Sequence, residues 1–312
     1  MFPLTFDHHD SNSITPMNMN GDDDSWFEEV IDDDLKWSFS LNSVLHKVIS
    51  EYQDIVLLDT KHFGKALVID GKMQSAESDE FIYHECLIHP PLLSHPNPKA
   101  VFIMGGGEGS TAREALKHKS IEKVIMCDID QEVLDLVIND AKVELDERKE
   151  KFDIIVGDLA DPVEGGPCYQ LYTKSFYQNI VKPKLNPNGI FVTQAGPAGV
   201  FTHQEVFSSI YNTIKQVFKY VVAYTAHVPS FADEWGWVMA SDTPFCIEEG
   251  KIDKKIRETI KGELLYLDGA SFCSLTVLNK MVSSTLKSET HVYTEDNARF
   301  IHGQGVGKKC NL

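Results

Sequence analysis

Between residues 100 and 195 the chain alternates short apolar runs with longer amphipathic stretches, and this alternation limits the possible folds to a small set. Four of the runs are typical of buried β-strands: VFIM, KVIMCD, FDIIVGD and GIFVTQ. Strands that are apolar throughout and separated by helical stretches are typical of a parallel sheet with helices on both faces. The sequence therefore predicts an α/β fold with a doubly wound sheet.

A different pattern precedes this region. Residues 1–24 are polar and acidic and lack apolar periodicity, so they are predicted to form a disordered tail. After them, the runs WSFSL, VLHKVI, DIVLLDT and KALVID are typical of short strands, with turns near Phe63-Gly64 and Asp70-Gly71. We therefore expect a small β-rich domain ahead of the larger sheet.

Helical apolar spacing in FIYHECLIHPPLL predicts a helix after the β-rich region, and Pro90-Pro91 is expected to interrupt or end it. HPNPK is then typical of a linker. The predicted division of the chain is an acidic tail at 1–24, a β-strand domain with its following helix at 25–95, a larger α/β domain at 96–305 and a tail at 306–312.

The formal net charge of −18 disfavours a surface that tracks nucleic-acid phosphates, because no basic run accompanies it. The acidity suits either a cationic ligand or simple solubility. The six cysteines show neither CxxC nor paired His/Cys spacing, so we expect reduced thiols without a zinc site or disulfides. No apolar stretch is long enough to span a bilayer and the N-terminus does not resemble a signal peptide, which predicts a cytoplasmic location.

A glycine-rich turn follows the first predicted strand of the sheet, in VFIMGGGEGSTAREALKH. Such a turn between a strand and a helix lets the backbone approach a nucleotide-containing ligand, although the turn alone is a weak signal. GGGEGS lacks the Lys-Ser/Thr pair of a P-loop, so phosphate binding is not expected. Glu108 at the helix entrance instead favours a cation or a hydroxyl group.

Carboxylates follow several of the predicted strands. Asp128 ends the strand in CDID, at the place where nucleoside-binding folds hold ribose hydroxyls. Asp140 and Asp158 end two later strands, and Asp161 comes shortly after. Because the ends of parallel strands lie on one edge of a sheet, these side chains are expected to meet in one binding crevice. Taken singly, each is explained equally well as a turn residue or a helix cap.

Together these motifs resemble the aminopropyltransferases, the family of spermidine, spermine and thermospermine synthases. The resemblance runs from about Trp37 almost to the C-terminus and is carried by YQDI (52–55), DGKMQSAESDEFIYHE (70–85), GGGEGS (105–110), CDID (127–130), NDA (139–141), GDLADP (157–162) and GPCYQLYTKSFY (166–177). It implies an N-terminal β domain, a Rossmann-like, methyltransferase-type catalytic domain and a homodimer or homotetramer. It also implies decarboxylated S-adenosylmethionine as a co-substrate, with no separate cofactor and no metal.

The matching positions transfer the family's donor contacts to this sequence. By resemblance, the donor-binding residues are Gln53, Gln74, His84, Glu108, Asp128, Asp140, Ala141, Pro167 and Leu171. The resemblance places Asp128 on the ribose and Asp140 on the adenine amino group, and it implies that Gln74 closes over the donor. Pro167 and Leu171 would pack on adenine, although ordinary core packing explains these two residues equally well.

By the same resemblance Asp158 is the proton acceptor, and Tyr83 and Asp161 contact the polyamine acceptor. By the same resemblance, VPSFADEWGW (228–237) replaces a stretch that in spermidine synthases usually carries a tyrosine near Phe231, and phenylalanine cannot donate a hydrogen bond. With Trp235 and Trp237 close by, this suggests an apolar channel long enough for a triamine, although core packing also explains the aromatic cluster. The stretch YTAHVPSFADEWGWVMASD is most similar to plant thermospermine synthases, so the resemblance implies spermidine as the acceptor.

Three alternatives stay open. A spermine or spermidine synthase of the same family would differ only in the acceptor or in the nitrogen that reacts. A methyltransferase would bind adenosine and a sulfonium at the same sheet edge, but its donor carries a carboxylate that suits an acidic site poorly. The third alternative is an inactive polyamine-binding subunit.

One segment is too short for the predicted topology. Between the strands in CDID and LDLVINDA only QEV and its neighbours are left, whereas a right-handed parallel crossover takes at least about 10 to 12 residues. The chain is therefore predicted to lack the helix and loop that the family has after Asp130. Such a loss is expected to displace Asp128 and Asp140, and it is the main reason to consider an inactive subunit.

Overall fold

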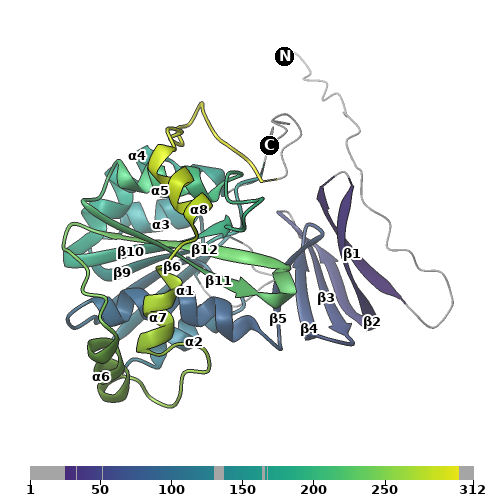
Figure 1. The fold of residues 1–312 in the computed structure, drawn as a ribbon, viewed down its shortest axis with the longest axis horizontal. Helices are drawn as coiled ribbons and strands as arrows, with labels where there is room; N and C mark the ends of the chain where they lie inside the picture. Colours follow the sequence, from purple (N-terminus) through teal and green to yellow (C-terminus); the bar gives the residue numbers. More distant parts are fainter. Residues whose placement is uncertain are drawn as a thin grey trace, which may run out of the picture.

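The computed structural model describes residues 25–301 except residue 33, residue 51, residues 130–136, residues 164 and 165, and residue 167. This described part contains two β-sheets joined by one long helix, α1 (Glu80–Ser94). Figure 1 shows the smaller N-terminal sheet beside the larger one, which has helices on both of its faces. The predicted α/β fold with an N-terminal β-rich region is confirmed.

Five antiparallel strands form the N-terminal sheet as a meander, in the order β1-β2-β3-β4-β5. They are β1 (Trp26–Asp32), β2 (Leu35–Ile49), β3 (Asp54–Thr60), β4 (Gly64–Ile69) and β5 (Lys72–Ala76). Both predicted turns are present: Gly64 begins β4, and Asp70 with Gly71 connects β4 to β5. The positive φ angles of Asp70 (51°) and Gly71 (74°) are those that a two-residue hairpin turn requires.

The larger sheet has seven strands in the order β11-β12-β10-β9-β6-β7-β8. The strands are β6 (Ala100–Gly105), β7 (Lys123–Asp128), β8 (Val137–Ile138), β9 (Phe152–Asp158), β10 (Leu185–Pro197), β11 (Tyr220–Val228) and β12 (Asp233–Ser241). The strands from β6 to β10 are parallel, as predicted, and each of the four apolar runs forms one of them. Strands β11 and β12 are antiparallel instead, because the short 3-10 helix η4 (Pro229–Phe231) between them cannot make a parallel crossover.

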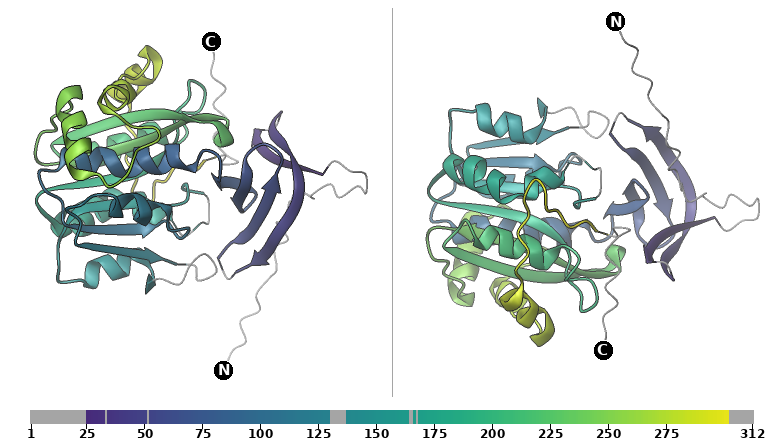
Figure 2. Two further views of the ribbon diagram at one scale, coloured as in Figure 1. Left: turned by 90° about the horizontal axis from the view of Figure 1, so that it is seen from below. Right: turned by 90° about the horizontal axis from the view of Figure 1, so that it is seen from above.

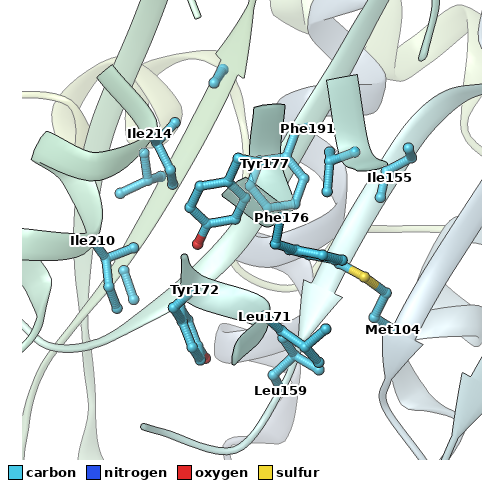
Figure 3. Close-up of a cluster of buried hydrophobic side chains, with 14 of the residues drawn as sticks. Met104, Ile155, Leu159, Leu171, Tyr172, Phe176, Tyr177, Phe191, Ile210 and Ile214 are labelled. Carbon is cyan, nitrogen blue, oxygen red and sulfur yellow. The ribbon is translucent and has the colours of Figure 1, made fainter. Parts of the chain in front are cut away.

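Side chains of β6 alternate between two hydrophobic cores on opposite faces of this sheet, with Val101 and Ile103 on one face and Phe102 and Met104 on the other. The helices on the first face are α1, α2 (Ser110–Leu116), α6 (Glu249–Thr259) and α7 (Gly269–Leu275). Those on the second face are α3 (Ala141–Glu147), α4 (Lys174–Phe176), α5 (Phe207–Lys215) and α8 (Lys280–Ser288). Figure 3 shows part of the second core, around Met104 and Tyr177. Within the ranges that the structure describes, every helix is too short or too polar to cross a lipid bilayer.

Pro90 and Pro91 lie inside α1, which continues to Ser94, so the expectation that they interrupt or end the helix is wrong. A proline cannot donate the hydrogen bond that its position would make to the carbonyl group four residues earlier. For Pro90 that group is the carbonyl of Cys86, and the buried hydroxyl of Tyr224 donates to it over 2.9 Å. A side chain from β11 therefore replaces the backbone bond that Pro90 cannot make.

Strand β8 has only two residues and pairs in parallel with β7. The connection from Asp128 to Val137 is shorter than the about 10 to 12 residues that such crossovers usually take. Most of this connection, residues 130–136, lies outside the described residues. The absence of a helix and loop after Asp130 therefore stays a prediction, while Asp128 pairs in parallel with Ile138.

Glu85 ties a C-terminal segment of the chain to α1. Its buried carboxylate accepts backbone N–H bonds from Leu265 (2.7 Å), Tyr266 (2.9 Å) and Leu267 (3.0 Å). A buried carboxylate is stable only where such donors replace its water. The segment that leads into α7 is therefore fixed against α1.

Replacing Glu85 by alanine should lower the free energy of unfolding by about 3 kcal/mol, because three N–H donors lose a charged acceptor at once. Urea denaturation followed by circular dichroism measures this loss. Glu263→Ala, at an exposed position of the same segment, is the control and should change the free energy by less than about 0.5 kcal/mol. Equal losses in the two variants would contradict the role assigned to Glu85.

Candidate active site

A pocket of about 220 Å³ lies between the N-terminal sheet and the carboxyl ends of the parallel strands. Figure 2 shows the N-terminal sheet beside the larger sheet. The strand order changes direction there, since the chain runs from β6 outward to β8 and returns to β9 on the other side of β6. Open α/β sheets bind ligands at such switch points, outside the carboxyl ends of the strands. From the N-terminal sheet side, the pocket is lined by Gln53, Leu67, Ile69 and Gln74.

The pocket collects most of the site residues that the sequence predicts. Those lining it are Gln53, Gln74, Tyr83, His84, Glu108, Asp128, Asp140, Ala141, Asp158 and Leu171. Asp161, Phe231 and Trp235 do not line it. Asp161 follows the lining residue Ala160, and the Phe231 ring lies 6.0 Å from the ring of the lining residue Tyr83. Trp235 contacts Phe231 and lies one layer further out. Pro167 is outside the described residues, so its packing on adenine stays a prediction.

Asp158 is the last residue of β9 and receives two side-chain hydrogen bonds. The Tyr83 hydroxyl donates to Oδ1 over 2.8 Å, and the Thr111 hydroxyl donates to Oδ2. Burial raises the pKa of the Asp158 carboxyl, while the charge of His84 and these two bonds act against the increase. The raised pKa makes Asp158 a stronger proton acceptor than an ordinary carboxylate.

The glycine-rich turn after β6 packs closely against Asp158. Gly105 has a φ of 78°, and a Cβ atom there would lie 2.1 Å from the Asp158 carbonyl oxygen. A Cβ atom on Gly106 would lie 2.9 Å from Asp158 Oδ2. Glycine at these positions lets the backbone pass the carboxylate, so that Glu108 reaches the same pocket.

His84 on α1 lies between two carboxylates. Its Nδ1 is 2.7 Å from Glu80 Oε2, and its Nε2 is 2.7 Å from Glu108 Oε1. Burial opposes a charge on this ring, but the bonds to Glu108 and Glu80 outweigh it and raise the pKa of His84 to about 10. His84 is therefore an imidazolium near neutral pH, and both nitrogens donate. The three residues are close enough to hold a metal ion, but these nitrogen–oxygen distances are those of hydrogen-bonded ion pairs.

Arg113 on α2 extends this chain of ion pairs away from the pocket. Its Nη2 donates to both carboxylate oxygens of Glu80, at 2.7 and 2.8 Å, and its Nε donates to Glu114 at 3.0 Å. Burial favours the protonated form of Glu80, but the bonds from His84 and Arg113 lower its pKa below the usual value. Glu80 therefore stays ionised and orients the His84 ring toward Glu108.

Asp161 follows β9 and is held by Gln194, near the end of β10. Gln194 Nε2 donates to Asp161 Oδ1 over 3.0 Å and to the carbonyl oxygen of Leu159 over 2.7 Å. Burial raises the pKa of Asp161 to about 7; the Gln194 bond opposes this shift, and the charge of Glu205 adds to it. A cation bound beside Asp161 would favour its ionised form.

Asp128 and Asp140 both line the pocket, but their backbone positions differ. Asp128 ends β7, as predicted. Asp140 follows β8 at the N-cap of α3, where its Oδ1 accepts the N–H of Lys142 over 2.8 Å. The strand in LDLVINDA therefore ends before Asp140, and the alternative of a helix cap applies to this residue. A cap bond uses only one of the two carboxylate oxygens.

Aromatic rings surround Tyr83. The rings of Phe231 and Trp237 lie 6.0 and 5.7 Å from the Tyr83 ring, and Trp235 lies 4.7 Å from Phe231. Trp237 is fully buried and belongs to the core. Phe231 and Trp235 are only partly buried, so core packing does not account for their whole surface.

Four side chains that organise the site are not among the residues predicted from the sequence, namely Thr111, Gln194, Glu80 and Arg113. Thr111 could have been found, because it follows the glycine-rich turn directly. Gln194 could also have been found, since it lies near the end of a parallel strand at the ligand-binding edge. Glu80 and Arg113 gave no signal, because their pairing depends on how α1 packs against α2.

The raised pKa of Asp161 predicts how cation binding depends on pH. An ammonium group binds the ionised carboxylate, and Asp161 becomes protonated below a pH of about 7, so the affinity for an aliphatic polyammonium ligand should fall there by up to about tenfold per pH unit. Isothermal titration calorimetry on both sides of this pH measures the fall. Asp161→Asn cannot ionise and should lose the dependence; an unchanged dependence in that variant would contradict the assignment.

Family models match most of the described chain. Residues 25–77 match the spermidine synthase tetramerisation domain, and residues 80–139 and 134–249 match the spermine/spermidine synthase domain. The two segments of the second match overlap at residues 134–139, which include the end of the short connection between β7 and β8.

Two relatives show how far the similarity extends. The chain is 69% identical over 318 residues to thermospermine synthase ACAULIS5 of Arabidopsis thaliana, with 96% of this chain and 94% of that protein covered. It is 42% identical over 277 residues to a polyamine aminopropyltransferase of Sulfurisphaera tokodaii, with 80% of this chain and 91% of that protein covered. The first alignment is longer than this chain of 312 residues, so the plant relative has residues without a counterpart here.

Solved structures share the fold. The spermidine synthase of Thermotoga maritima has a TM-score of 0.76 and 28% identity, with 85% of this chain and 94% of that chain covered. A spermidine synthase in complex with the transition-state analogue AdoDATO has a TM-score of 0.77 and 28% identity, with coverages of 85% and 95%. The resemblance inferred from the sequence motifs is thereby confirmed: this chain belongs to the spermine/spermidine synthase family of aminopropyltransferases.

Proposed function

We propose that this chain is a thermospermine synthase, which transfers the aminopropyl group of decarboxylated S-adenosylmethionine to spermidine. The observation that carries the proposal is the 69% identity to the Arabidopsis thermospermine synthase over almost the full length of both chains. The pocket supports it, because Asp158, Tyr83 and His84 lie together at the switch point of the sheet.

The reaction needs a base. An aliphatic amine has a pKa of about 10.4 and is mostly protonated near neutral pH, and an ammonium nitrogen has no lone pair with which to attack. Asp158, with its raised pKa and its bonds to Tyr83 and Thr111, is the proposed proton acceptor. With the proton on Asp158, the nitrogen bonds to the methylene carbon of the aminopropyl group beside the sulfonium. The bond between that carbon and the sulfur breaks, and methylthioadenosine leaves. No covalent enzyme intermediate is required.

The donor side of the proposal uses the acidic end of the pocket. Asp128 would hold the ribose, and Asp140 with Ala141 would hold the adenine, which Leu171 and Pro167 would cover. The aminopropyl end would lie near Gln53, Gln74, His84 and Glu108. Decarboxylation leaves the donor with an ammonium group and no carboxylate, so a pocket lined by several carboxylates suits it better than the donor of a methyltransferase.

The acceptor side combines charge with apolar surface. A polyamine alternates ammonium groups with methylene chains, so it needs both kinds of contact. Tyr83 and Asp161 are the proposed polar contacts, and the partly buried rings of Phe231 and Trp235 would border the methylene chain. Holding the reacting nitrogen in line with the carbon–sulfur bond can contribute roughly 7 to 11 kcal/mol in favourable cases.

The proposal also covers the oligomeric state, the need for a cofactor and the cellular location. We infer a homodimer or homotetramer, which is supported by the tetramerisation-domain match at residues 25–77 and by exposed apolar side chains on β1 and β2: Trp26, Val30, Leu35, Leu45 and Ile49. The two substrates are proposed to suffice without a further cofactor. A cytoplasmic location without nucleic-acid or membrane partners stays a prediction from composition.

A second candidate, a polyamine-binding subunit without turnover, is favoured by one observation. The connection between β7 and β8 is short, and the Arabidopsis relative has residues that this chain lacks. This connection follows Asp128, so donor binding is the step that a defect there would impair. Spermidine would then bind without being converted.

The proposal is tested by incubating the protein with decarboxylated S-adenosylmethionine and spermidine. The products are then analysed by chromatography that separates thermospermine from spermine. We expect thermospermine together with an equal amount of methylthioadenosine. Spermine as the sole product, or spermidine formed from putrescine, would assign another synthase of the same family. Spermidine binding without any product would support the inactive subunit, and methylation with S-adenosylmethionine would indicate a methyltransferase.

A further inference from the structure

Asp79 directly precedes α1, at the position where a carboxylate ordinarily caps the helix by accepting an N–H bond from the first turn. Its side chain makes no such bond. The residue is only 5% exposed, so its carboxylate needs a partner within the protein. The partner lies in a distant part of the chain.

That partner is the hairpin between β11 and β12. Asp79 Oδ2 accepts the backbone N–H of Ser230 over 2.7 Å, and Ser230 is fully buried. The two residues are 151 positions apart in the sequence. The bond therefore joins the start of α1, between the two sheets, to a turn at the edge of the larger sheet.

Ser230 is followed directly by Phe231, which packs against both the N-terminal core and the core that contains α1. The Phe231 ring lies 6.0 Å from the Tyr83 ring, whose hydroxyl donates to Asp158. Ala232 has a positive φ of 57°, so the backbone turns sharply after Phe231. A displacement of Ser230 would move Phe231 relative to Tyr83.

We propose that Asp79 is a positioning residue for the acceptor: by holding the Ser230 N–H it places Phe231 against Tyr83 and sets the space left for the methylene chain. This inference rests on the proposed function. Asp79 touches no reacting atom and acts only through the η4 turn. Its loss should therefore weaken acceptor binding while leaving donor binding unchanged.

A purely structural role is the competing explanation, and Asp153 provides a matched control for it. Asp153 also accepts backbone N–H bonds, from Lys99 (2.8 Å) and Ala100 (3.0 Å). It lies at the start of β9, the end of that strand opposite to Asp158. Replacing it removes the same kind of interaction far from the pocket.

The test compares Asp79→Ala, Asp79→Asn and Asp153→Ala. For each variant we would measure steady-state kinetics, with both substrates varied, and the melting temperature. Asp79→Ala should raise the KM for spermidine about tenfold and change the KM for the donor by less than about twofold. Asp79→Asn keeps an acceptor oxygen and should restore the wild-type KM. Asp153→Ala should lower the melting temperature but keep both KM values. If Asp79→Ala does not fold, Asp79→Glu, which shifts the carboxylate by one methylene group, should raise the same KM.

The outcomes separate this inference from the proposed function. An unchanged KM for spermidine in Asp79→Ala, or equal increases for both substrates, would overturn the role of Asp79. If the wild-type chain makes no product, the proposed function fails, and spermidine binding is then measured by calorimetry. Weaker binding to Asp79→Ala than to Asp153→Ala would still support the positioning role, and equal binding would refute it.

Discussion

The hydrogen bonds to the carboxylate of Asp158 connect the main parts of this molecule. Tyr83 donates from the helix that joins the two sheets, and Thr111 donates from the helix after the glycine-rich turn. The turn itself fits against Asp158 only because Gly105 and Gly106 have no side chains. A partly buried carboxylate is costly without such donors, so α1, α2 and β9 must meet at the switch point of the sheet for it to be tolerated.

The charges around this carboxylate are balanced in a way that suits cationic substrates. His84 is kept as an imidazolium by Glu80 and Glu108, and Arg113 in turn keeps Glu80 ionised. The positive charge of His84 limits the increase in the pKa of Asp158 that burial causes. The pocket therefore offers carboxylates to cations, while the proposed base has a pKa above that of an ordinary carboxyl.

How much of the fold and of the site could be predicted from the sequence depends on how far apart in the sequence the interacting residues are. The parallel strands, the glycine-rich turn and the carboxylates at the strand ends follow from local pattern and from the geometry of parallel sheets, which brings Asp128 and Asp158 together. Tyr224 donates to α1 beside its prolines, and Asp79 accepts the N–H of Ser230 in the turn that contains Phe231. These contacts join positions far apart in the sequence, so local patterns could not predict them.

The central claim is that Asp158 accepts the proton of the attacking amine, and a single-turnover measurement on Asp158→Asn tests it most directly. Asparagine keeps the shape of the side chain and an oxygen that can accept the bonds from Tyr83 and Thr111, but it cannot take up the proton. The account predicts that donor affinity stays within about twofold of wild type while the rate of aminopropyl transfer falls by about 10² to 10⁴. A transfer rate close to that of the wild-type protein would contradict it.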